Sequence, residues 1–361
     1  MSQLLTIQAA RGIAANLVVL SHLCIVEAKY TAGGVLPAFT FYGIAGVDLF
    51  FVLSGFIMVA VVGHYTGPID FLWRRVTRIY PTYWLASLVV LALAIFVPTI
   101  VNSSVNVPIS LWCSFLLIPD RTVPLLAVGW TLVHEMYFYL AFAIILALRI
   151  PMFAGLAIWG VLIILIMVTI PDKVVAFPIL RVAASPLTTE FMIGAIVGIL
   201  WTKRWLSGAI AMGIVGLLGL VLAIVYVAPM LSLATSQHLE AWRVLIFGVP
   251  SALIVYALAA VEHLQPSMRT GKLLVSLGDW SYATYLTHVL AISAIGRMLA
   301  LFVPNGGIGA SLALIGVGLL AANIAGAGIH VFFERPTLNW LHEFSARLRR
   351  SDRVVCDQVI E

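Results

Sequence analysis

Ten apolar stretches, most of them about twenty residues long, run through this 361-residue sequence and constrain its fold more than any other feature. A helix of roughly 20 apolar residues crosses the hydrocarbon core of a bilayer, which is about 30 Å thick. A helix also satisfies its own backbone hydrogen bonds, as a lipid environment demands. The stretches cover residues 4–26, 39–62, 82–96, 125–148, 153–170, 186–201, 209–227, 244–260, 273–302 and 308–333. The sequence therefore predicts an all-α integral membrane protein, a bundle of about ten transmembrane helices. The ninth stretch is too long for one span, so we expect residues 273–279 to form an interfacial helix before it.

The composition excludes most other classes of protein. Hydrophobic residues make up 62% of the chain and charged residues 10%, against about half and a quarter in soluble domains. The net charge of +5 is typical of basic connections at a membrane surface and does not by itself indicate nucleic-acid binding. The three cysteines, Cys24, Cys113 and Cys356, lie far apart, so we expect no metal site. We predict one polytopic domain over residues 1–361, with a membrane core at 5–336 and a short basic tail at 337–361.

The distribution of lysine and arginine predicts the orientation in the membrane. Ten spans place both ends of the chain on one side, and basic residues concentrate in cytoplasmic connections. Most of the 20 basic residues fall in the connections on the side of the termini or in the tail. The opposite connections contain Lys29, Arg121, Lys173, Arg181 and Arg243. Both termini are therefore predicted to be cytoplasmic.

Ionisable side chains inside the spans are candidates for function, because each costs at least a few kcal/mol in hydrocarbon. They are Arg11, His22, Asp48, His134, Glu135, Glu190, His288, Arg297 and His330. Arg11 and His22 are eleven residues apart, almost three helical turns, and so project from one helix face. A neutral His22 can accept a proton, and we expect a histidine to pair with the buried Glu135. For any one of these residues alone, a role in holding helices together is an equally good explanation.

Two motifs lie at the predicted cytoplasmic ends of spans. Arg75 and Arg78 are spaced i,i+3 in the connection before residue 82, so a short helix would present both to one phosphate group. Contact with anionic lipid is the alternative. At the end of the last span we expect Pro336 to end the helix and leave Glu334 and Arg335 at the cytoplasmic surface.

Two further motifs place polar groups within spans. Asp48 and Ser54 lie among small residues of the second span, where helices can approach closely around a polar site. Tyr285 and His288 are i,i+3 neighbours in the ninth span and could face one cavity.

Six motifs follow one another along the chain. They are Arg11-x10-His22, Gly46-Val-Asp-Leu-Phe-Phe-Val-Leu-Ser-Gly55, Arg75-x2-Arg78-Ile-x-Pro81, Trp130-Thr-x3-Glu135, Ser281-Tyr-x2-Tyr-Leu-x-His288 and Phe333-Glu-Arg-Pro336. Their order resembles that of the membrane acyltransferase type 3 family, and from about residue 5 to residue 336 the chain most resembles the exopolysaccharide-modifying acetyltransferases of that family. Six motifs in this order indicate the family more strongly than any one of them does alone.

The resemblance implies an enzyme that moves an acyl group, usually acetyl, from cytoplasmic acetyl-CoA to a hydroxyl of an extracytoplasmic or lipid-linked glycan. It implies a multi-pass protein of a bacterial inner (cytoplasmic) membrane, acting alone, as a homo-oligomer or with machinery for polysaccharide biosynthesis and export. The outer connection at residues 97–124 is where we expect acceptor contacts.

The resemblance also implies roles for individual residues. His22 resembles the family's essential histidine, Arg11 its channel arginine and Glu135 its buried carboxylate. Arg75 and Arg78, with Arg74 beside them, resemble its inner-face basic group for the phosphates of CoA.

Two mechanisms and one other function stay open. His22 could act as a general base with Glu135 fixing its tautomer, or it could itself be acylated and relay the group. Trp130, Ser54 and Tyr285 are the candidates for stabilising the oxyanion. The alternative function is a secondary transporter of a lipid-linked or anionic solute, with His22, Asp48 and Glu135 as a proton relay.

Overall fold

The computed structural model describes residues 4–31, 33–97, 109–227, 239–264, 270–303, 306–345 and 347, and the regular structure in these ranges is entirely helical. Ten helices in them are long and apolar enough to cross a membrane, in agreement with the predicted all-helical bundle. They run over Leu5–Tyr30, Ala38–Ala60, Pro68–Phe96, Ala127–Leu148, Met152–Thr169, Pro178–Thr202, Ala209–Val227, Ala241–Leu264, Ser281–Phe302 and Ile308–Ser345. Part of the expected acceptor segment, residues 98–108, and most of the basic tail lie outside the described residues.

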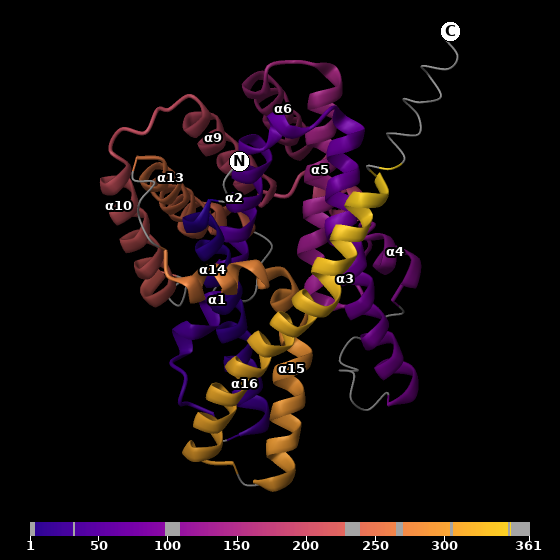
Figure 1. The fold of residues 1–361 in the computed structure, drawn as a ribbon, viewed down its shortest axis with the longest axis vertical. Coiled ribbons are helices and arrows are strands. Elements are labelled where there is room, and N and C mark those ends of the chain that lie inside the picture. The colour runs from indigo at the N-terminus through magenta and orange to yellow at the C-terminus, as the bar shows by residue number, and fades with distance from the viewer. Residues whose placement is uncertain are drawn as a thin grey trace.

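Helix α1 (Leu5–Tyr30) lies at the centre of the bundle (Figure 1). It contacts α2 (Ala45–Ala60), α13 (Val249–Leu264), α14 (Lys272–Asp279), α15 (Ser281–Phe302) and α16 (Ile308–Ile329). The first turn of α1 has no cap from its own segment. Instead, the Glu262 carboxylate of α13 accepts the backbone N–H groups of Leu5 at 2.6 Å and Thr6 at 3.0 Å. A carboxylate at this position satisfies free N–H groups and faces the positive end of the helix dipole, so it fixes the start of α1.

Among the described elements, α2 and α9 (Thr188–Thr202) pack against each other most extensively. A Cβ atom added to Gly55 of α2 would lie 1.9 Å from the carbonyl oxygen of Phe191, and one added to Gly194 of α9 would lie 2.0 Å from that of Val52. Only glycine permits such an approach of two backbones. Two other pairs pack extensively, α15 with α16 and α10 (Ala209–Leu222) with α13.

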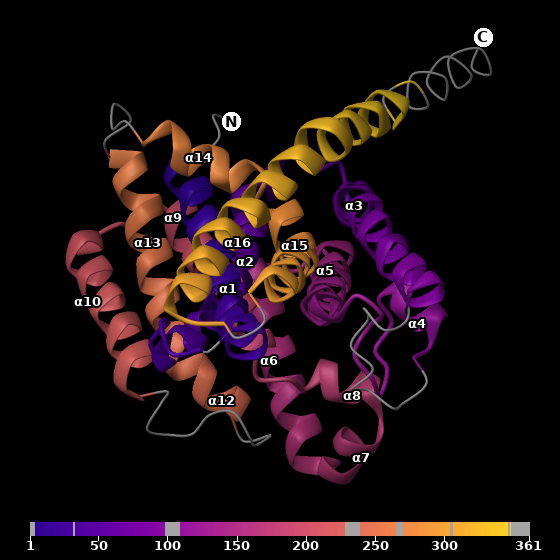
Figure 2. The ribbon, with the colours of Figure 1, turned by 90° about the horizontal axis from the view of Figure 1, so that it is seen from below.

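The outer helices expose apolar faces of the kind that lipid covers. Leu140 on α5 (Trp130–Leu148), Leu162 on α6 (Met152–Thr169) and Leu217 on α10 are 54%, 50% and 57% exposed. Short helices complete the described chain (Figure 2). These are η1 (Ala38–Ile44), η2 (Val62–His64), α4 (Leu111–Leu116), η3 (Ala127–Gly129), α7 (Pro171–Ala176), α8 (Pro178–Ala183), η4 (Ala223–Val227), α12 (Leu239–Arg243), η5 (Val244–Gly248) and η6 (His330–Glu334).

The third span begins earlier than predicted. Helix α3 is continuous over Pro68–Phe96 with Pro81 inside it, so the expected connection before residue 82 is wrong. A proline removes one backbone hydrogen bond from a helix, which neighbouring groups in a membrane bundle can offset. Next to this point the Tyr282 hydroxyl of α15 donates to the carbonyl of Ile79 at 2.7 Å. Arg75 and Arg78 therefore project from a long, anchored helix.

The last helix also continues through a proline. Beyond α16 the backbone forms a π-helical turn, η6, and then stays helical to Ser345, so the prediction that Pro336 ends the helix is wrong. The wider π turn just before Pro336 accommodates a ring that would clash within an unbroken α-helix. Glu334 is not at the surface: it is 3% exposed and accepts from His330 Nδ1 at 3.0 Å, whereas Arg335 is exposed.

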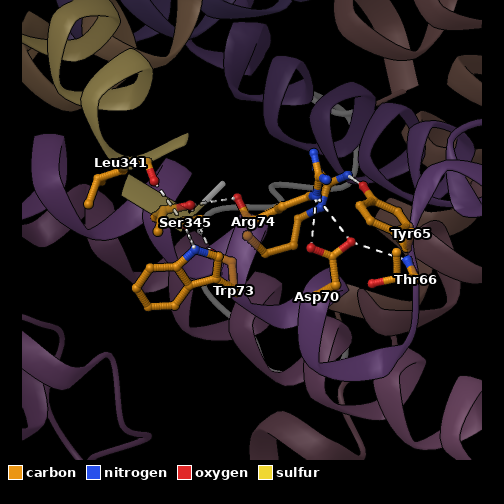
Figure 3. A network of polar contacts seen from close by, with 9 residues as sticks. Tyr65, Thr66, Asp70, Trp73, Arg74, Leu341 and Ser345 are labelled. Atoms are coloured by element: carbon orange, nitrogen blue, oxygen red, sulfur yellow. Dashed lines mark hydrogen bonds and ion pairs between the residues drawn. The ribbon is translucent and has the colours of Figure 1, made fainter. Parts of the chain in front are cut away.

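The far end of this helix is tied to α3. Trp73 Nε1 donates to the hydroxyl of Ser345 at 2.7 Å, and Ser345 donates to the carbonyl of Leu341 (Figure 3).

The predicted division of the ninth stretch is confirmed, because α14 ends at Asp279 and α15 begins at Ser281.

Candidate active site

Helices α1, α2, α3, α5 and α15 surround a partly open cavity of about 90 Å3. Its apolar walls come mainly from α2, including Phe50 and Phe51. Its polar lining consists of Arg11, Ser54, Arg75, Arg78, Thr131, Glu135, Tyr139, Tyr282 and Tyr285. Six of the predicted site residues, Arg11, Ser54, Arg75, Arg78, Glu135 and Tyr285, thus share one cavity.

Three arginines give this cavity a positive charge. Arg75 is 8% exposed, and its guanidinium lies 5.7, 5.6 and 5.7 Å from the ring centroids of Tyr65, Phe71 and Tyr139. It also donates to the Tyr65 hydroxyl. Among the described residues, neither Arg11 nor Arg78 forms an ion pair with a carboxylate. Three guanidinium groups with one carboxylate, Glu135, make a site suited to a polyanion.

Glu135 pairs with hydroxyl groups. Its Oε1 accepts from Ser54 Oγ at 3.1 Å and from the Tyr139 hydroxyl, one turn later on the same helix. The expectation that a histidine pairs with this carboxylate is therefore wrong. Sequence reasoning also missed Tyr139 and Tyr282 as lining residues, although the i,i+4 spacing of Glu135 and Tyr139 was a usable signal.

His22 lies outside the residues that line the cavity, although Arg11 on the same helix lines it. Its Nδ1 is 3.0 Å from the carbonyl oxygen of Val18, and its ring meets that of His288 edge-on with centroids 4.8 Å apart. His288 is fully buried, and its ring centroid lies 5.9 Å from that of Tyr285. The Tyr285 side chain lines the cavity, so a ring neighbour of His288 forms part of the cavity wall.

Tyr285 is held in place by η3 and the first turn of α5. Its hydroxyl lies 2.9 Å from Thr131 Oγ1 and donates to the carbonyl of Val128 at 3.1 Å. The ring of Tyr285 also packs edge-on against Phe50. The cavity wall nearest the histidines is therefore a fixed one.

Three other predicted site residues lie outside the cavity lining. Asp48 is fully buried and accepts two hydrogen bonds from Arg243, at 3.1 Å from Nε and 2.7 Å from a terminal nitrogen. Sequence reasoning had placed Arg243 in an outer connection. Arg74 forms an ion pair with Asp70, with Nε 3.2 Å from Oδ1, and the Arg74 side chain is 41% exposed (Figure 3). Trp130 packs edge-on against neighbouring aromatic rings.

The described residues contain no group of three or more His, Cys, Asp or Glu side chains that could hold a metal ion. The polar groups that line the cavity are guanidinium, carboxylate and hydroxyl groups.

Comparison with known protein families now identifies the chain. A family model described as an acyltransferase domain matches residues 4–330. The chain belongs to the membrane acyltransferase type 3 family. The resemblance seen in the six motifs is thereby confirmed, and the protein is a membrane acyltransferase.

Two relatives match over most of their length. The chain is 32% identical over 315 residues to the exopolysaccharide production protein ExoZ of Rhizobium meliloti (strain 1021), covering 82% of this chain and 90% of the relative. It is 28% identical over 358 residues to the acyltransferase MdmB of Streptomyces mycarofaciens, covering 87% and 86%. No solved structure gives a significant match. Family membership favours an enzyme over the transporter that the intramembrane charges alone also allow.

Proposed function

We propose that this membrane acyltransferase moves an acetyl group, or a similar short acyl group, from cytoplasmic acetyl-CoA to a hydroxyl of an extracytoplasmic or lipid-linked polysaccharide. The observation that carries the proposal is the convergence of Arg11, Arg75 and Arg78 on one cavity that also contains Glu135. The name of the relative ExoZ, an exopolysaccharide production protein, supports a polysaccharide as the acceptor.

The phosphates of the donor would bind at Arg75 and Arg78. Guanidinium groups bind phosphate bidentately, and a partly enclosed site strengthens the interaction. The aromatic rings around Arg75 fix its guanidinium before the donor arrives, which lowers the entropy cost of binding. The acyl arm would extend past Tyr285 toward His22, so the nucleotide does not have to cross the membrane. This arrangement requires the part of the cavity that Arg75 and Arg78 line to face the cytoplasm.

Acyl transfer needs a base for the acceptor hydroxyl and a donor for the oxyanion. His22 would supply the base. Because a carbonyl can only accept, the contact with Val18 makes Nδ1 of a neutral His22 the protonated nitrogen and leaves Nε2 free to take a proton. The hydroxyl groups of Ser54 and Tyr285 line the cavity, with their protons donated to Glu135 and to the Val128 carbonyl, whereas Trp130 does not line it.

The central test is transfer of labelled acetyl from acetyl-CoA in inverted membrane vesicles, with a glycolipid extract as acceptor. Inversion exposes the predicted cytoplasmic face to the added donor. We expect free CoA and labelled glycolipid from the wild-type chain and neither from His22→Ala, with normal protein levels in the membrane. The matched control is His64→Ala, which removes an exposed histidine of η2 and should leave transfer unchanged. Equal transfer by His22→Ala would refute the role of His22, and no CoA release from wild type with any extract would refute the donor.

The donor site has its own test. Arg78→Gln should raise KM for acetyl-CoA at least tenfold, because a charge-assisted contact contributes about 1.5–3 kcal/mol. Lys203→Gln, an exposed basic residue beyond the end of α9, is the control. An unchanged KM in Arg78→Gln would place the phosphates elsewhere.

The base mechanism can be separated from an acyl-histidine relay. Wild-type protein is mixed with labelled acetyl-CoA without acceptor, quenched and digested. Label on the peptide that contains His22 would show the relay, and its absence together with normal transfer supports direct attack.

A further inference from the structure

A second cavity, of about 350 Å3, lies between the connection that follows α4 and the junction of α7 with α8. It is lined by Arg121, Ala176, Pro178 and Arg181, and it shares no lining residue with the cavity that contains Glu135. The distribution of basic residues predicts that both arginines lie on the outer side of the membrane. This is the side on which the acceptor is expected, opposite the donor.

Neither guanidinium in this cavity is neutralised by a neighbouring carboxylate. Both arginines are exposed, and among the described residues neither forms an ion pair. Asp120, next to Arg121 in the chain, uses its Oδ1 to accept the backbone N–H of Arg121 at 2.7 Å. Its backbone carbonyl accepts from a terminal nitrogen of Arg181 at 3.4 Å. A guanidinium has five N–H donors, so each arginine keeps donors for a ligand.

The segment that contains Arg121 is fixed by α3. Three side chains of α3 donate to backbone carbonyls at the end of α4: Tyr80 to Leu116 at 2.8 Å, Tyr83 to Ser114 at 2.6 Å and Trp84 to Phe115 at 2.9 Å. The last carbonyls of a helix have no partner within it, so these bonds fix the end of α4. The Ser114 hydroxyl accepts the backbone N–H of Leu125 at 3.0 Å. Both ends of the connection around Arg121 are therefore anchored.

The segment that contains Arg181 is fixed by α5 and α6. The Tyr137 hydroxyl of α5 donates to the carbonyl of Ala183, the last residue of α8, at 3.3 Å. Trp159 Nε1 of α6 donates to the Tyr137 oxygen at 2.9 Å. Two anchored segments thus present the arginines to one cavity, which lowers the entropy cost of binding a ligand there.

The ligand that fits two guanidinium groups is an oxyanion, because each group can donate two parallel N–H bonds to a carboxylate or a phosphate. We propose that Arg121 and Arg181 bind an acidic group, a carboxylate or a phosphate, of the glycan acceptor, so that the enzyme prefers acidic polysaccharides. This inference rests on the proposed function and on the predicted orientation, and it names the class of acceptor. Because a polysaccharide repeats, the acidic group does not have to belong to the sugar that receives the acyl group.

Binding of a soluble acidic glycan tests the site without any acyl donor. The full chain in nanodiscs of phosphatidylcholine is titrated with a fluorescent oligogalacturonate, and a neutral galactose oligosaccharide of equal length is the matched probe. We expect the acidic probe to bind more tightly than the neutral one and to lose affinity as salt is added. Arg121→Gln and Arg181→Gln should each weaken binding of the acidic probe about fivefold, the upper end for an exposed charge pair.

Two control variants accompany this titration. Lys29→Gln removes an exposed basic residue at the predicted outer end of α1 and should leave binding unchanged. Arg181→Lys keeps the charge and should recover part of the affinity that Arg181→Gln loses. Equal affinity for the two probes, or equal binding of the acidic probe by wild type and the Arg121→Gln/Arg181→Gln double variant, would overturn the proposal.

An anionic lipid headgroup offers the same phosphate chemistry, so a second measurement separates the two sources. Wild type and the double variant are extracted from membranes that contain phosphatidylglycerol and exchanged into phosphatidylcholine nanodiscs, and the lipid that stays bound is quantified by mass spectrometry. Equal amounts of phosphatidylglycerol support a glycan site. Loss of this lipid from the double variant would assign the arginines to the headgroup and overturn the proposal.

Transfer assays distinguish failure of this inference from failure of the proposed function. The glycolipid extract is divided by anion exchange into acidic and neutral fractions. The double variant should raise KM for the acidic fraction at least about tenfold and leave KM for acetyl-CoA unchanged. Normal transfer with an unchanged KM for the acidic fraction would refute the site alone. No CoA release from wild type, with arginine-dependent binding of oligogalacturonate intact, would refute the proposed function alone.

Discussion

Replacing Asp48 by asparagine tests how strongly a buried ion pair holds this bundle together. Asp48 is fully buried on α2, and the side chain of its partner Arg243 at the end of α12 is 16% exposed. Asp48→Asn keeps the size of the side chain and removes its charge. The guanidinium then stays in place without the carboxylate.

The geometry sets the expected magnitude. Two hydrogen bonds, at 3.1 and 2.7 Å, join the charged groups, and each bond of this kind contributes about 1.5–3 kcal/mol. Removing one partner of a buried pair costs about 3–5 kcal/mol, because the other charge stays desolvated. The ratio of folded to unfolded protein should therefore fall by roughly two to three and a half orders of magnitude.

The assay is the equilibrium unfolding of purified protein in mixed micelles, applied to a double-mutant cycle of Asp48→Asn and Arg243→Gln. We expect a coupling energy of about 2 kcal/mol or more between the two sites, so that the double variant is more stable than the sum of the single losses predicts. The matched control is Glu343→Gln: the Glu343–Arg347 pair is 3.8 Å long and highly exposed, so this change should have no measurable effect. Equal stability of Asp48→Asn and Glu343→Gln, or a coupling energy near zero, would show that this ion pair does not hold the bundle together.

Three further predictions follow from single contacts. Gly55→Ala should lower the melting temperature sharply, because the added Cβ would overlap a carbonyl oxygen of α9. The control Gly63→Ala has open space around the added Cβ and should leave the melting temperature unchanged. Equal melting temperatures of the two variants would contradict the close packing of α2 and α9. Glu262→Gln removes the charge at the first turn of α1 and should cost about 1–2 kcal/mol, seen as faster hydrogen exchange in that turn; unchanged exchange would show that the cap is dispensable. Tyr65→Phe frees the Arg75 guanidinium and should raise KM for acetyl-CoA about tenfold with kcat unchanged; a loss confined to kcat would mean that Arg75 does not bind the donor.

The apolar pattern was sufficient to predict the helical bundle and the division of the ninth stretch. Each span is determined locally, because about twenty consecutive apolar residues have to form a helix in lipid whatever surrounds them. The predicted helix ends near the two prolines are wrong, because a proline was judged by its local effect on a helix alone. Pro81 and Pro336 were expected to end helices, but α3 continues through Pro81, and the last helix continues through Pro336 after a π turn.

The partners of polar side chains were decided by the tertiary structure. The sequence by itself determined which ionisable residues enter the membrane, and the spacing of Arg75 and Arg78 placed both on one face. The sequence could not determine that Glu135 accepts a hydrogen bond from Ser54, that Asp48 pairs with Arg243 or that the ring of His22 packs edge-on against that of His288. Each of these contacts joins residues far apart in the chain, and which helices become neighbours depends on close packing such as that of α2 against α9. A helix face is encoded locally, but the group opposite it is fixed only when the whole bundle has assembled.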